Sequence, residues 1–338
     1  MRQVVVARHG PPDVLELRER PDPTPAAGEV RIRVRAAGVN FADILARIGL
    51  YPDAPAPPVV LGYEVAGQVD AVGPDVTAIG PGERVLAATR FGGYADVVVC
   101  PAAQVFPIPA NLSDAEAAAI PVNYLTAAVA LYKMANVAAG ETVLVHNAGG
   151  GVGIAAAQLA GLRRATIIGT ASAGKHDALR AFGVERAIDY RHANVEAEVR
   201  KLTKGRGVDV VLDPLGGASV AASYRMLAPL GRLVILGVSS AVAGERRSLI
   251  HAFRMWWTLP RFKPLSLVHR NRGVFGLNLA HLWEERRQLD SLMRMLLSEF
   301  QAGRLRPVVA RTFPLDRAAD AHRFIHSRAN IGKVVLTT

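Results

Sequence analysis

The stretch VLVHNAGGGVG, residues 143–153, decides the fold of this chain. An apolar, β-branched run leads into a cluster of glycines, and the next residues, IAAAQLA at 154–160, favour a helix. This order of strand, tight turn and helix is typical of a dinucleotide site, where backbone N–H groups at the helix N-terminus face the pyrophosphate. Ala148, Gly150 and Gly153 occupy the three small-residue positions of the fingerprint, with alanine at the first. The sequence therefore predicts a buried strand followed by a pyrophosphate-binding turn.

The segments around this turn alternate between strand and helix patterns. Strands are predicted near 142–146, 165–169, 185–188, 208–212, 231–236 and 274–279. Six strands joined by right-handed crossovers make a doubly wound parallel sheet, the Rossmann arrangement of an α/β protein. An arginine-rich insertion over 240–272 separates the last two strands, and a helix is predicted over 281–302. The final run, GKVVL at 332–336, is predicted to be a strand that returns to the first domain.

The first 110 residues have a different pattern, with short β-like runs broken by proline and glycine. These runs lie at 30–34, 64–69, 84–87 and 95–99, and their spacing favours a barrel-like β domain. Ser113 and Glu116 form a capping box that opens an alanine-rich helix, which we expect Pro121 to end. The expected division is a β domain over 1–119, a cofactor domain over 120–283, and a C-terminal part over 284–338 that completes the first domain.

The end of the second predicted strand bears on the cofactor. A site for NAD usually carries Asp or Glu about 20 residues after the glycines, where the carboxylate binds the ribose hydroxyls. Residues 170–176 read TASAGKH and contain no carboxylate. The hydroxyl of Ser172 and the ammonium group of Lys175 suit a 2′-phosphate instead. The sequence therefore favours NADPH over NADH.

Composition limits the class of protein. The chain has 338 residues, of which 50% are hydrophobic and 20% charged, enough for two domains with substantial cores. Its one cysteine, Cys100, excludes intramolecular disulfides and is expected to be inert. Residues 1–6 enter a strand-like pattern without a signal peptide, so we expect a cytoplasmic protein. The net charge is +11, but no nucleic-acid motif accompanies it; we attribute the charge to arginine-rich composition and an anionic cofactor.

A second motif, GYEVAG at 62–67, resembles the zinc-alcohol-dehydrogenase signature of the medium-chain dehydrogenase/reductase superfamily. Tyr63 stands where that signature has a zinc-binding histidine. Asn40 stands where the superfamily has a cysteine ligand, and Val122 stands at the third ligand position. A catalytic zinc needs three protein ligands, which histidine and cysteine commonly supply, and none of these positions offers either. The sequence therefore predicts no metal.

These replacements resemble the zinc-free quinone oxidoreductase branch of the superfamily, over essentially the whole chain. Several motifs look closer still to the synaptic-vesicle membrane protein (vesicle amine transport protein) homologues: NFAD at 40–43, GLY at 49–51, VNY at 122–124, GTAS at 169–172, DPLGG at 213–217 and NIGKV at 330–334. The resemblance implies a Rossmann domain, a β-rich GroES-like barrel domain, NADPH as cofactor, and a homodimer formed through the edge of the cofactor sheet.

The resemblance also implies a set of site residues. Ser172, Lys175 and Tyr190 would surround the 2′-phosphate and adenine, and Thr126, Gly150, Gly151, Val152 and Gly153 would line the pyrophosphate. Leu236, Gly237, Phe275 and Leu277 would frame the nicotinamide and its ribose, with Asn330 closing the site. Asn40 and Tyr51 would face the nicotinamide from the first domain.

Hydride transfer to a carbon conjugated with a carbonyl places negative charge on the oxygen. A tyrosine hydroxyl or an asparagine amide can donate a hydrogen bond to that oxygen, and a tyrosine can also deliver a proton. Tyr51 is the preferred candidate, because related enoyl-thioester reductases are thought to use a tyrosine at the corresponding place. Tyr63 is the second candidate, with packing in the former zinc pocket as its alternative role, and Asn40 is the third. His146 is interpreted as a structural histidine.

Three functions remain open from the sequence. The leading one is a zinc-independent, NADPH-dependent reductase of quinones or α,β-unsaturated carbonyls, with substrate bound between the domains. The second is an enoyl-thioester reductase that acts on acyl-CoA or carrier-bound substrates. The third is an NADPH-binding peripheral membrane or lipid-handling protein with little catalysis. Its support is the interleaving of aromatic and basic residues over 244–272, including Trp256 and Trp257. That segment suits a weak membrane contact, a substrate lid or a dimer contact.

Overall fold

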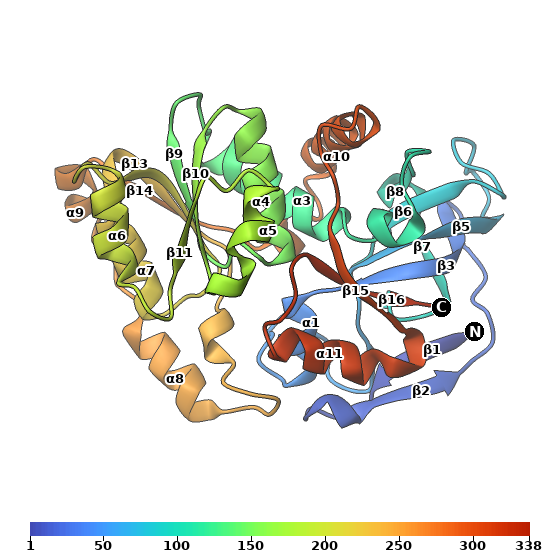
Figure 1. Ribbon diagram of the computed structural model, residues 1–338. Coiled ribbons are helices and arrows are strands. Elements are labelled where there is room, and N and C mark those ends of the chain that lie inside the picture. Colours follow the sequence, from blue (N-terminus) through green and yellow to red (C-terminus); the bar gives the residue numbers. More distant parts are fainter. The chain divides into compact units, whose positions relative to one another are not determined.

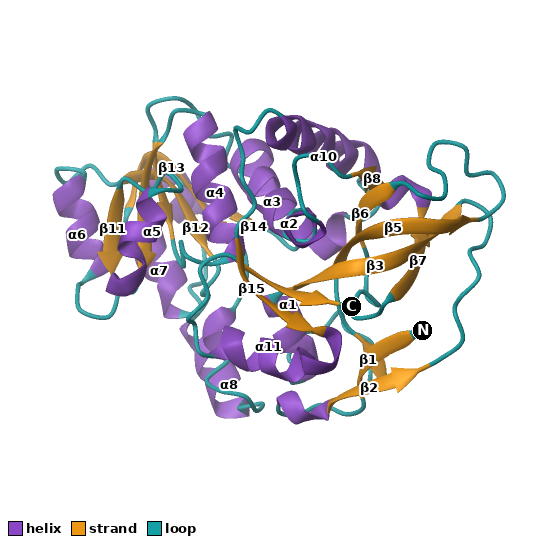
Figure 2. Ribbon diagram, turned by 45° about the vertical axis from the view of Figure 1, so that its right-hand side comes forward, coloured by secondary structure: helices purple, strands orange, loops and turns teal.

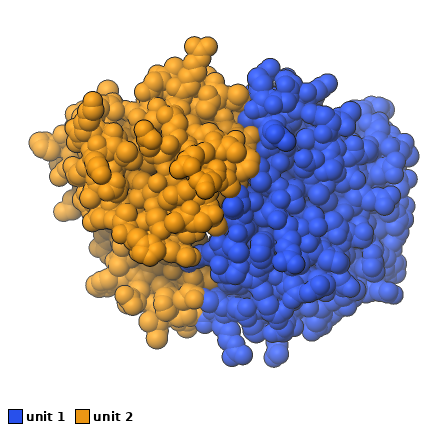
Figure 3. Space-filling view, viewed as in Figure 1, with its two compact units in different colours: residues 1–123, 244–247, 285–338 blue, residues 124–243, 248–284 orange.

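A computed structural model describes all residues, 1–338, and divides the chain into two compact units (Figure 3). Unit 1 comprises Met1–Asn123, Gly244–Arg247 and Glu285–Thr338. Unit 2 comprises Tyr124–Ala243 and Ser248–Glu284. No helix in either unit combines the length and the hydropathy that crossing a bilayer requires.

Unit 2 contains a six-stranded parallel sheet with the order β11-β10-β9-β12-β13-β14 (Figure 1). The strands are β9 (Thr142–Val145), β10 (Thr166–Ala171), β11 (Arg186–Asp189), β12 (Val208–Asp213), β13 (Leu227–Ile235) and β14 (Gly273–Gly276). All six predicted strands are present, and the order reverses between β9 and β12. The carboxyl ends of strands at such a reversal form the crevice where open α/β sheets bind ligands.

Helices cover this sheet on its faces (Figure 2). They are α3 (Pro121–Ala128, whose first residues belong to unit 1), the π-helical turn η3 (Val129–Met134), α4 (Gly151–Leu162), η4 (Ala173–Lys175), α5 (His176–Arg180), α6 (Val195–Leu202), α7 (Ala218–Arg225) and η5 (Ser239–Ala241). The predicted insertion forms α8 (Leu249–Thr258) and α9 (Pro264–Arg270), and η6 (Leu279–Leu282) follows β14. Because both faces are covered, strand residues such as Leu144, Val211 and Leu233 are fully buried.

Unit 1 is rich in β structure. One sheet has the order β15-β16-β3-β5-β6-β8 with β7 paired to β3, and a smaller sheet has the order β2-β1-β4. The strands are β1 (Arg2–Val6), β2 (Leu15–Glu19), β3 (Glu29–Val39), β4 (Val59–Val60), β5 (Glu64–Val72), β6 (Arg84–Ala88), β7 (Val97–Pro101), β8 (Val105–Pro107), β15 (Val309–Pro314) and β16 (Lys333–Thr337). The predicted return of the chain end is confirmed, because β16 pairs with β3.

Two helices of unit 1 were predicted, and both differ from the predictions in their bounds. The helical elements of the unit are η1 (Pro12–Val14), α1 (Phe41–Arg47), η2 (Ala102–Gln104), α2 (Asp114–Ala117), α10 (Arg286–Gln301), η7 (Leu315–Arg317) and α11 (Ala318–His326). The capping box forms as predicted, but α2 is short and ends after Ala117. Pro121 begins α3 instead of ending the first helix. Proline suits the first position of a helix because its missing N–H would have no intrahelical partner there.

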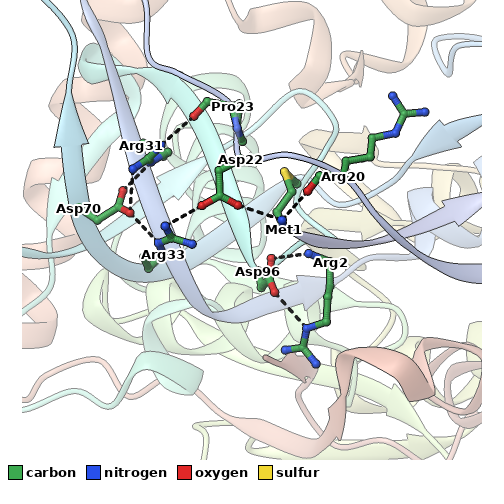
Figure 4. Close-up of polar contacts among 9 residues, drawn as sticks. All are labelled: Met1, Arg2, Arg20, Asp22, Pro23, Arg31, Arg33, Asp70 and Asp96. Atoms are coloured by element: carbon green, nitrogen blue, oxygen red, sulfur yellow. Dashed lines mark hydrogen bonds and ion pairs between the residues drawn. The ribbon is translucent and has the colours of Figure 1, made fainter.

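Surface ion pairs join the first strands of unit 1 to their neighbours (Figure 4). The Asp70 carboxylate accepts hydrogen bonds from Arg31 at 2.8 Å and from Arg33 at 2.5 Å. Arg33 also pairs with Asp22 at 2.7 Å, and Asp22 lies 2.9 Å from the N-terminal ammonium group. The hydrogen bond from that ammonium group and the one from Arg33 lower the pKa of Asp22. Solvent-exposed pairs of this kind contribute little stability each.

Cys100 lies in β7 opposite Val30 and is buried in the core of unit 1. Burial raises the pKa of its thiol to about 12, and the nearby charge of Glu29 acts in the same direction. The thiol is therefore protonated at neutral pH, which agrees with the expectation that it is inert.

Candidate functional site

The glycine-rich turn has the close packing that a dinucleotide fingerprint requires. Gly150 is the N-cap of α4, so the N–H groups of the first helical residues, Gly151, Val152 and Gly153, have no acceptor within the helix. A Cβ atom added to Gly153 would lie 2.4 Å from the carbonyl oxygen of Asn147, a distance that only glycine avoids. The predicted turn is confirmed, and its N–H groups are available to an anion.

The first fingerprint position tolerates alanine for a local reason. Ala148 is fully buried and faces Gly169 in β10, where an added Cβ would lie 2.8 Å from the Cβ of Ala148. Glycine at 169 therefore leaves room for the methyl group of Ala148. Local sequence patterns do not reveal this contact, because the two residues lie on different elements.

Two cations lie beside the turn. An added Cβ on Gly149 would lie 3.0 Å from Cδ of Lys175, so the Lys175 side chain crosses the turn. Burial lowers the pKa of Lys175, and the positive charge of Arg191 lowers it further. The Arg191 guanidinium lies 5.9 Å from the centre of the exposed Tyr190 ring. The structure thus places Arg191 near Lys175. The sequence analysis did not select Arg191, although Arg191 directly follows Tyr190 just after β11. Ser172 is the N-cap of the turn that carries Lys175.

A pocket of about 450 Å³ opens at the carboxyl ends of β13 and β14 in unit 2. It is lined mainly by apolar atoms of Met134, Ile235, Gly237, Val238, Gly276, Leu277, Asn278, His281 and Leu282. Gly237 and Leu277 are predicted nicotinamide residues, whereas Leu236 and Phe275 adjoin the lining residues without belonging to them. Met134 and His281 were not predicted, because both come from short helical turns that have no motif.

The remaining predicted cofactor residues lie outside this pocket. Thr126 is half-buried on α3. Asn330 belongs to unit 1, where its side-chain amide donates to the carbonyl of Gly332 at 3.0 Å.

His146 has the structural role that the sequence indicated. Its two ring nitrogens lie 3.2 Å from the Thr170 hydroxyl and 3.1 Å from the Ser223 hydroxyl. Burial lowers the pKa of the imidazole, which is neutral at physiological pH. Ser223 in turn donates to Asp213 at 2.8 Å, and Asp213 accepts the backbone N–H groups of the turn at 215–216. The histidine therefore fixes β9 against the turn after β12.

In unit 1, a buried polar cluster surrounds Asn40, the N-cap of α1. The Asn40 amide nitrogen donates to Glu64 at 2.9 Å, and its oxygen accepts a hydrogen bond from the Lys333 ammonium group. Lys333 also pairs with Glu64, which accepts the backbone N–H of Val122 at 2.8 Å. Glu64 is 0% and Lys333 3% exposed. We call Asn40, Glu64 and Lys333 the Glu64 cluster; it fixes the orientation of the Asn40 amide.

Asp43 connects this cluster to the segment before β5. Its carboxylate accepts the backbone N–H of Asn40 at 2.7 Å, that of Gly62 at 3.0 Å, and the Tyr94 hydroxyl. Burial raises the pKa of Asp43 to about 7, although its hydrogen bonds and the Lys333 charge oppose the change. Asp43 thereby holds α1 and the residue before Tyr63 in one fixed arrangement.

A chain of buried hydrogen bonds continues from Tyr94 to α11. The Tyr94 hydroxyl lies 3.1 Å from Nε2 of His322, and Nδ1 of His322 accepts from Nε of Arg47 at 3.1 Å. Because an arginine can only donate, the His322 proton is on Nε2 and is directed at Tyr94. Arg47 also contacts His326 at 2.8 Å, and burial lowers the pKa of Arg47 to about 10. None of these four side chains was singled out from the sequence.

Tyr63 is the exception in this well-paired region. Its side chain is buried, and its hydroxyl has no hydrogen-bond partner, which is rare for a buried polar group. Its ring packs edge-on against Tyr51, with ring centres 6.3 Å apart, and lies 5.1 Å from Phe91. Burial raises the pKa of the phenol, and the charge of Asp43 acts in the same direction. The neutral hydroxyl can therefore donate a hydrogen bond.

The three positions that correspond to zinc ligands do not fit zinc. The Asn40 amide is held by Glu64 and Lys333, and Val122 offers only a backbone N–H, which binds Glu64. Tyr63 carries a protonated phenol, a poor ligand. No three His, Cys, Asp or Glu side chains are grouped in a way that could hold a metal ion. The donor atoms available here lack the nitrogen and sulfur ligands that zinc prefers.

Comparisons with known proteins agree with this architecture. Residues 26–110 match the alcohol dehydrogenase GroES-like domain, and residues 182–336 match the zinc-binding dehydrogenase family. The chain belongs to the medium-chain dehydrogenase/reductase superfamily. Its relatives include the synaptic vesicle membrane protein VAT-1 homolog of Homo sapiens, which is 39% identical over 339 residues that cover 99% of this chain and 86% of the relative. The superfamily and the relatives expected from Asn40, Tyr63 and the shorter motifs are thus confirmed.

Two solved structures are similar over nearly the whole chain. The Escherichia coli quinone oxidoreductase complexed with NADPH has a TM-score of 0.89 and 30% identity, and the match covers 100% of both chains. The CurK enoyl reductase has a TM-score of 0.86 and 29% identity, and the match covers 99% of this chain and 98% of the other.

Proposed function

We propose that this protein is a zinc-independent, NADPH-dependent reductase of quinones or α,β-unsaturated carbonyls. The observation that carries the proposal is the Tyr63 hydroxyl, which is buried, neutral and without a partner at a position where zinc-dependent members have a ligand. A buried donor that no protein group satisfies is available to a substrate oxygen. The NADPH complex of the E. coli quinone oxidoreductase supports the choice of cofactor.

Unit 2 supplies the groups that would hold NADPH. The N–H groups of Gly151, Val152 and Gly153 would bind the pyrophosphate, and Lys175 and Arg191 would bind the 2′-phosphate. The pocket at β13 and β14 would take the nicotinamide. Bound NADPH supplies the hydride for the reduction.

Unit 1 supplies the groups that would act on the substrate oxygen. Tyr63 donates a hydrogen bond as negative charge develops there, and Tyr51 packs against Tyr63 and fixes its ring. The Asn40 amide is already bonded to Glu64 and Lys333, so we assign it a positioning role. We therefore rank Tyr63 above the half-buried Tyr51, because Tyr63 is buried and its hydroxyl is unpaired.

The test follows NADPH oxidation with phenanthrenequinone, benzoquinone, an alkenal and crotonyl-CoA, each repeated with NADH and with EDTA. We expect turnover of quinones and the alkenal with NADPH and no effect of EDTA. Tyr63→Phe should lower kcat for the alkenal roughly 10-fold or more, since one oxyanion donor is lost. Quinones need less activation, so their turnover should fall less.

Tyr224→Phe is the matched control, because Tyr224 is the other tyrosine with a buried hydroxyl that has no partner, and it belongs to unit 2 whereas Tyr63 belongs to unit 1. It should leave turnover unchanged. Full activity of Tyr63→Phe on the alkenal would remove Tyr63 from the mechanism. Faster turnover of crotonyl-CoA than of quinones would favour an enoyl-thioester reductase, the activity named for the similar CurK structure.

We also propose a homodimer that forms through β14. This strand is the edge of the parallel sheet, and Phe275 on it is 37% exposed. An open strand edge with an exposed aromatic side chain can pair with its copy. Light scattering of the purified protein checks the mass.

A further inference from the structure

Two fully buried ionisable side chains of α1, Asp43 and Arg47, are joined through other residues. They are four positions apart, a spacing at which an acid and a base on one helix often pair directly. Here Tyr94 and His322 lie between them, and all four side chains are 0% exposed. His322 comes from α11, which lies beside α1 (Figure 1, Figure 2). We call these four residues the Arg47 network.

The hydrogen bonds of the Arg47 network run in one direction. Nε of Arg47 donates to Nδ1 of His322 at 3.1 Å, so the imidazole proton is on Nε2 and faces the Tyr94 hydroxyl at 3.1 Å. The Tyr94 hydroxyl accepts this hydrogen bond and donates one to Asp43. Hydrogen bonds in such a series polarise one another, so the loss of one member weakens the others.

The outer end of the network is anchored at Arg47. Its other hydrogen bonds go to Nε2 of His326 at 2.8 Å and to the carbonyl oxygens of Gly10 and Glu245. None of these partner atoms belongs to a carboxylate, although a buried arginine usually pairs with one. Through His322 and Tyr94, Arg47 is connected to the carboxyl group of Asp43 instead.

The inner end of the network holds the backbone beside Tyr63. Asp43 accepts the backbone N–H of Gly62 at 3.0 Å, and Gly62 directly precedes Tyr63. Tyr94 touches the same residue, because a Cβ atom added to Gly62 would lie 2.7 Å from Cδ1 of the Tyr94 ring. The φ angle of Gly62 is +99°, which favours glycine. The network therefore holds Gly62 both by a hydrogen bond and by a ring contact.

The direction of the Tyr63 hydroxyl depends on this backbone. The hydroxyl has no hydrogen-bond partner, so no polar contact at the end of the side chain fixes it. Its ring packs against Tyr51 and Phe91, and its backbone follows Gly62. A donor to a reacting atom has to be held within about 0.5 Å of its productive position. A shift of Gly62 would therefore misdirect the phenol.

We propose that Tyr94 and His322 are positioning residues for the reduction. They complete the Arg47 network, which holds Gly62 and thereby directs the Tyr63 phenol at the substrate oxygen. The inference rests on the proposed function, because Tyr63 is the proposed hydrogen-bond donor to the substrate. Tyr94 and His322 are fully buried and act through Tyr63, not by contact with the substrate.

Tyr94→Phe tests the proposal, since it removes the hydroxyl of the network and keeps the ring. We expect kcat for the alkenal to fall roughly 5–10-fold, because the Tyr63 phenol is no longer held in place. KM for NADPH should not change, since the residues proposed to bind NADPH belong to unit 2. Tyr132→Phe is the matched control, because Tyr132 in unit 2 also donates its hydroxyl, to the Leu159 carbonyl at 2.8 Å. It should leave both kinetic constants unchanged.

A double-mutant cycle separates positioning from a general loss of structure. If Tyr94 acts through Tyr63, the variant Tyr63→Phe/Tyr94→Phe should have the same kcat for the alkenal as Tyr63→Phe alone. Losses that multiply in the double variant would overturn the inference. Full alkenal activity of Tyr94→Phe beside a slow Tyr63→Phe would also overturn it, and would leave the proposed function standing. Full activity of Tyr63→Phe would overturn both.

Two substitutions of His322 test the direction of the hydrogen bonds. A glutamine amide can accept from Arg47 through its oxygen and donate to Tyr94 through its nitrogen, whereas leucine can do neither. We therefore expect His322→Gln to retain more of the alkenal turnover than His322→Leu. Equal losses in the two variants would contradict the proposal.

Amide hydrogen exchange gives a measurement that needs no substrate. The backbone N–H of Gly62 should exchange several-fold faster in Tyr94→Phe than in the wild type or in Tyr132→Phe, because Asp43 is held less firmly. An unchanged exchange rate at Gly62 would overturn the link between the Arg47 network and Tyr63.

Discussion

The Glu64 cluster of unit 1 and helix α8 of unit 2 depart from the usual distribution of side chains in opposite directions. Lys333 and Glu64 carry charge in the core, whereas Trp257 and Ile250 stand in solvent. Buried charge and exposed apolar patches are the informative exceptions to the rule that apolar residues lie inside. The charges of the Glu64 cluster are paired within the fold, whereas the apolar side chains of α8 are not covered by it. The first arrangement fixes the Asn40 amide, and the second leaves apolar area exposed.

The largest effect expected from this comparison is the loss of Lys333. Lys333→Met leaves Glu64 buried without its counter-ion, so we expect a loss of about 3–5 kcal/mol in the free energy of unfolding. The control is Arg33→Met, which removes a cation that forms surface ion pairs with Asp70 and Asp22 (Figure 4). The free energy of unfolding should fall by at most about 1 kcal/mol in this variant. Urea unfolding measures both. Equal losses in the free energy of unfolding would show that the buried ion pair matters no more to stability than the surface pairs.

A second prediction compares one substitution in two amphipathic helices. Leu296 in α10 is 0% exposed, and Leu249 in α8 is 63% exposed. Leu296→Ala should destabilise the protein by about 2–5 kcal/mol because it leaves a cavity. Leu249→Ala should change stability by no more than about 0.5 kcal/mol. Thermal or urea unfolding measures the difference; a large loss for Leu249→Ala would indicate that α8 is covered within the folded protein.

The smallest expected effect concerns pH. The pKa of Asp43 is about 7 in the folded protein and near 3.8 when unfolded, so the folded state holds a proton that the unfolded state releases. The stability contributed by this proton is complete below pH 3.8 and is lost as the pH rises through 7. Between pH 6.5 and pH 8 the wild type should therefore lose roughly 1 kcal/mol relative to Asp43→Asn.

The comparison with Asp43→Asn is necessary because the buried histidines change the stability in the opposite direction as the pH rises. Burial lowers the pKa of His146 and His322, so their contributions grow as the pH rises. Subtracting the variant removes those terms. A difference between the two proteins that is independent of pH would show that Asp43 does not titrate in this range.

The sequence contained most of the fold, because the features that produce it are local. The glycine turn at 143–153 and the apolar runs of six strands are each readable within a few residues. The short helix after Ser113 was predicted too long, since alanine propensity favoured a continuous helix and Pro121 was read only as an end. Propensity does not show that a proline can begin the next helix.

The candidate site was less accessible to sequence reading, because its contacts join distant segments. Asn40 and Tyr63 were recognised by their positions in a family motif. Lys333, which fixes Asn40 from 293 residues away, gave no local signal. Arg191 likewise depends on the sheet bringing β11 beside β10. The aromatic and basic residues over 244–272 were visible in the sequence, but only the structure shows that α8 leaves its apolar side chains exposed.

The buried state of Cys100 has a consequence for an enzyme with the proposed substrates. Quinones and enones are electrophiles that alkylate thiolates by conjugate addition, so a reductase of such compounds risks being inactivated by them. The only thiol of this chain is 3% exposed and has a pKa of about 12. Hardly any thiolate exists at neutral pH, and the sulfur is out of reach of dissolved substrate. Inactivation through the thiol is therefore closed to such compounds while the protein is folded.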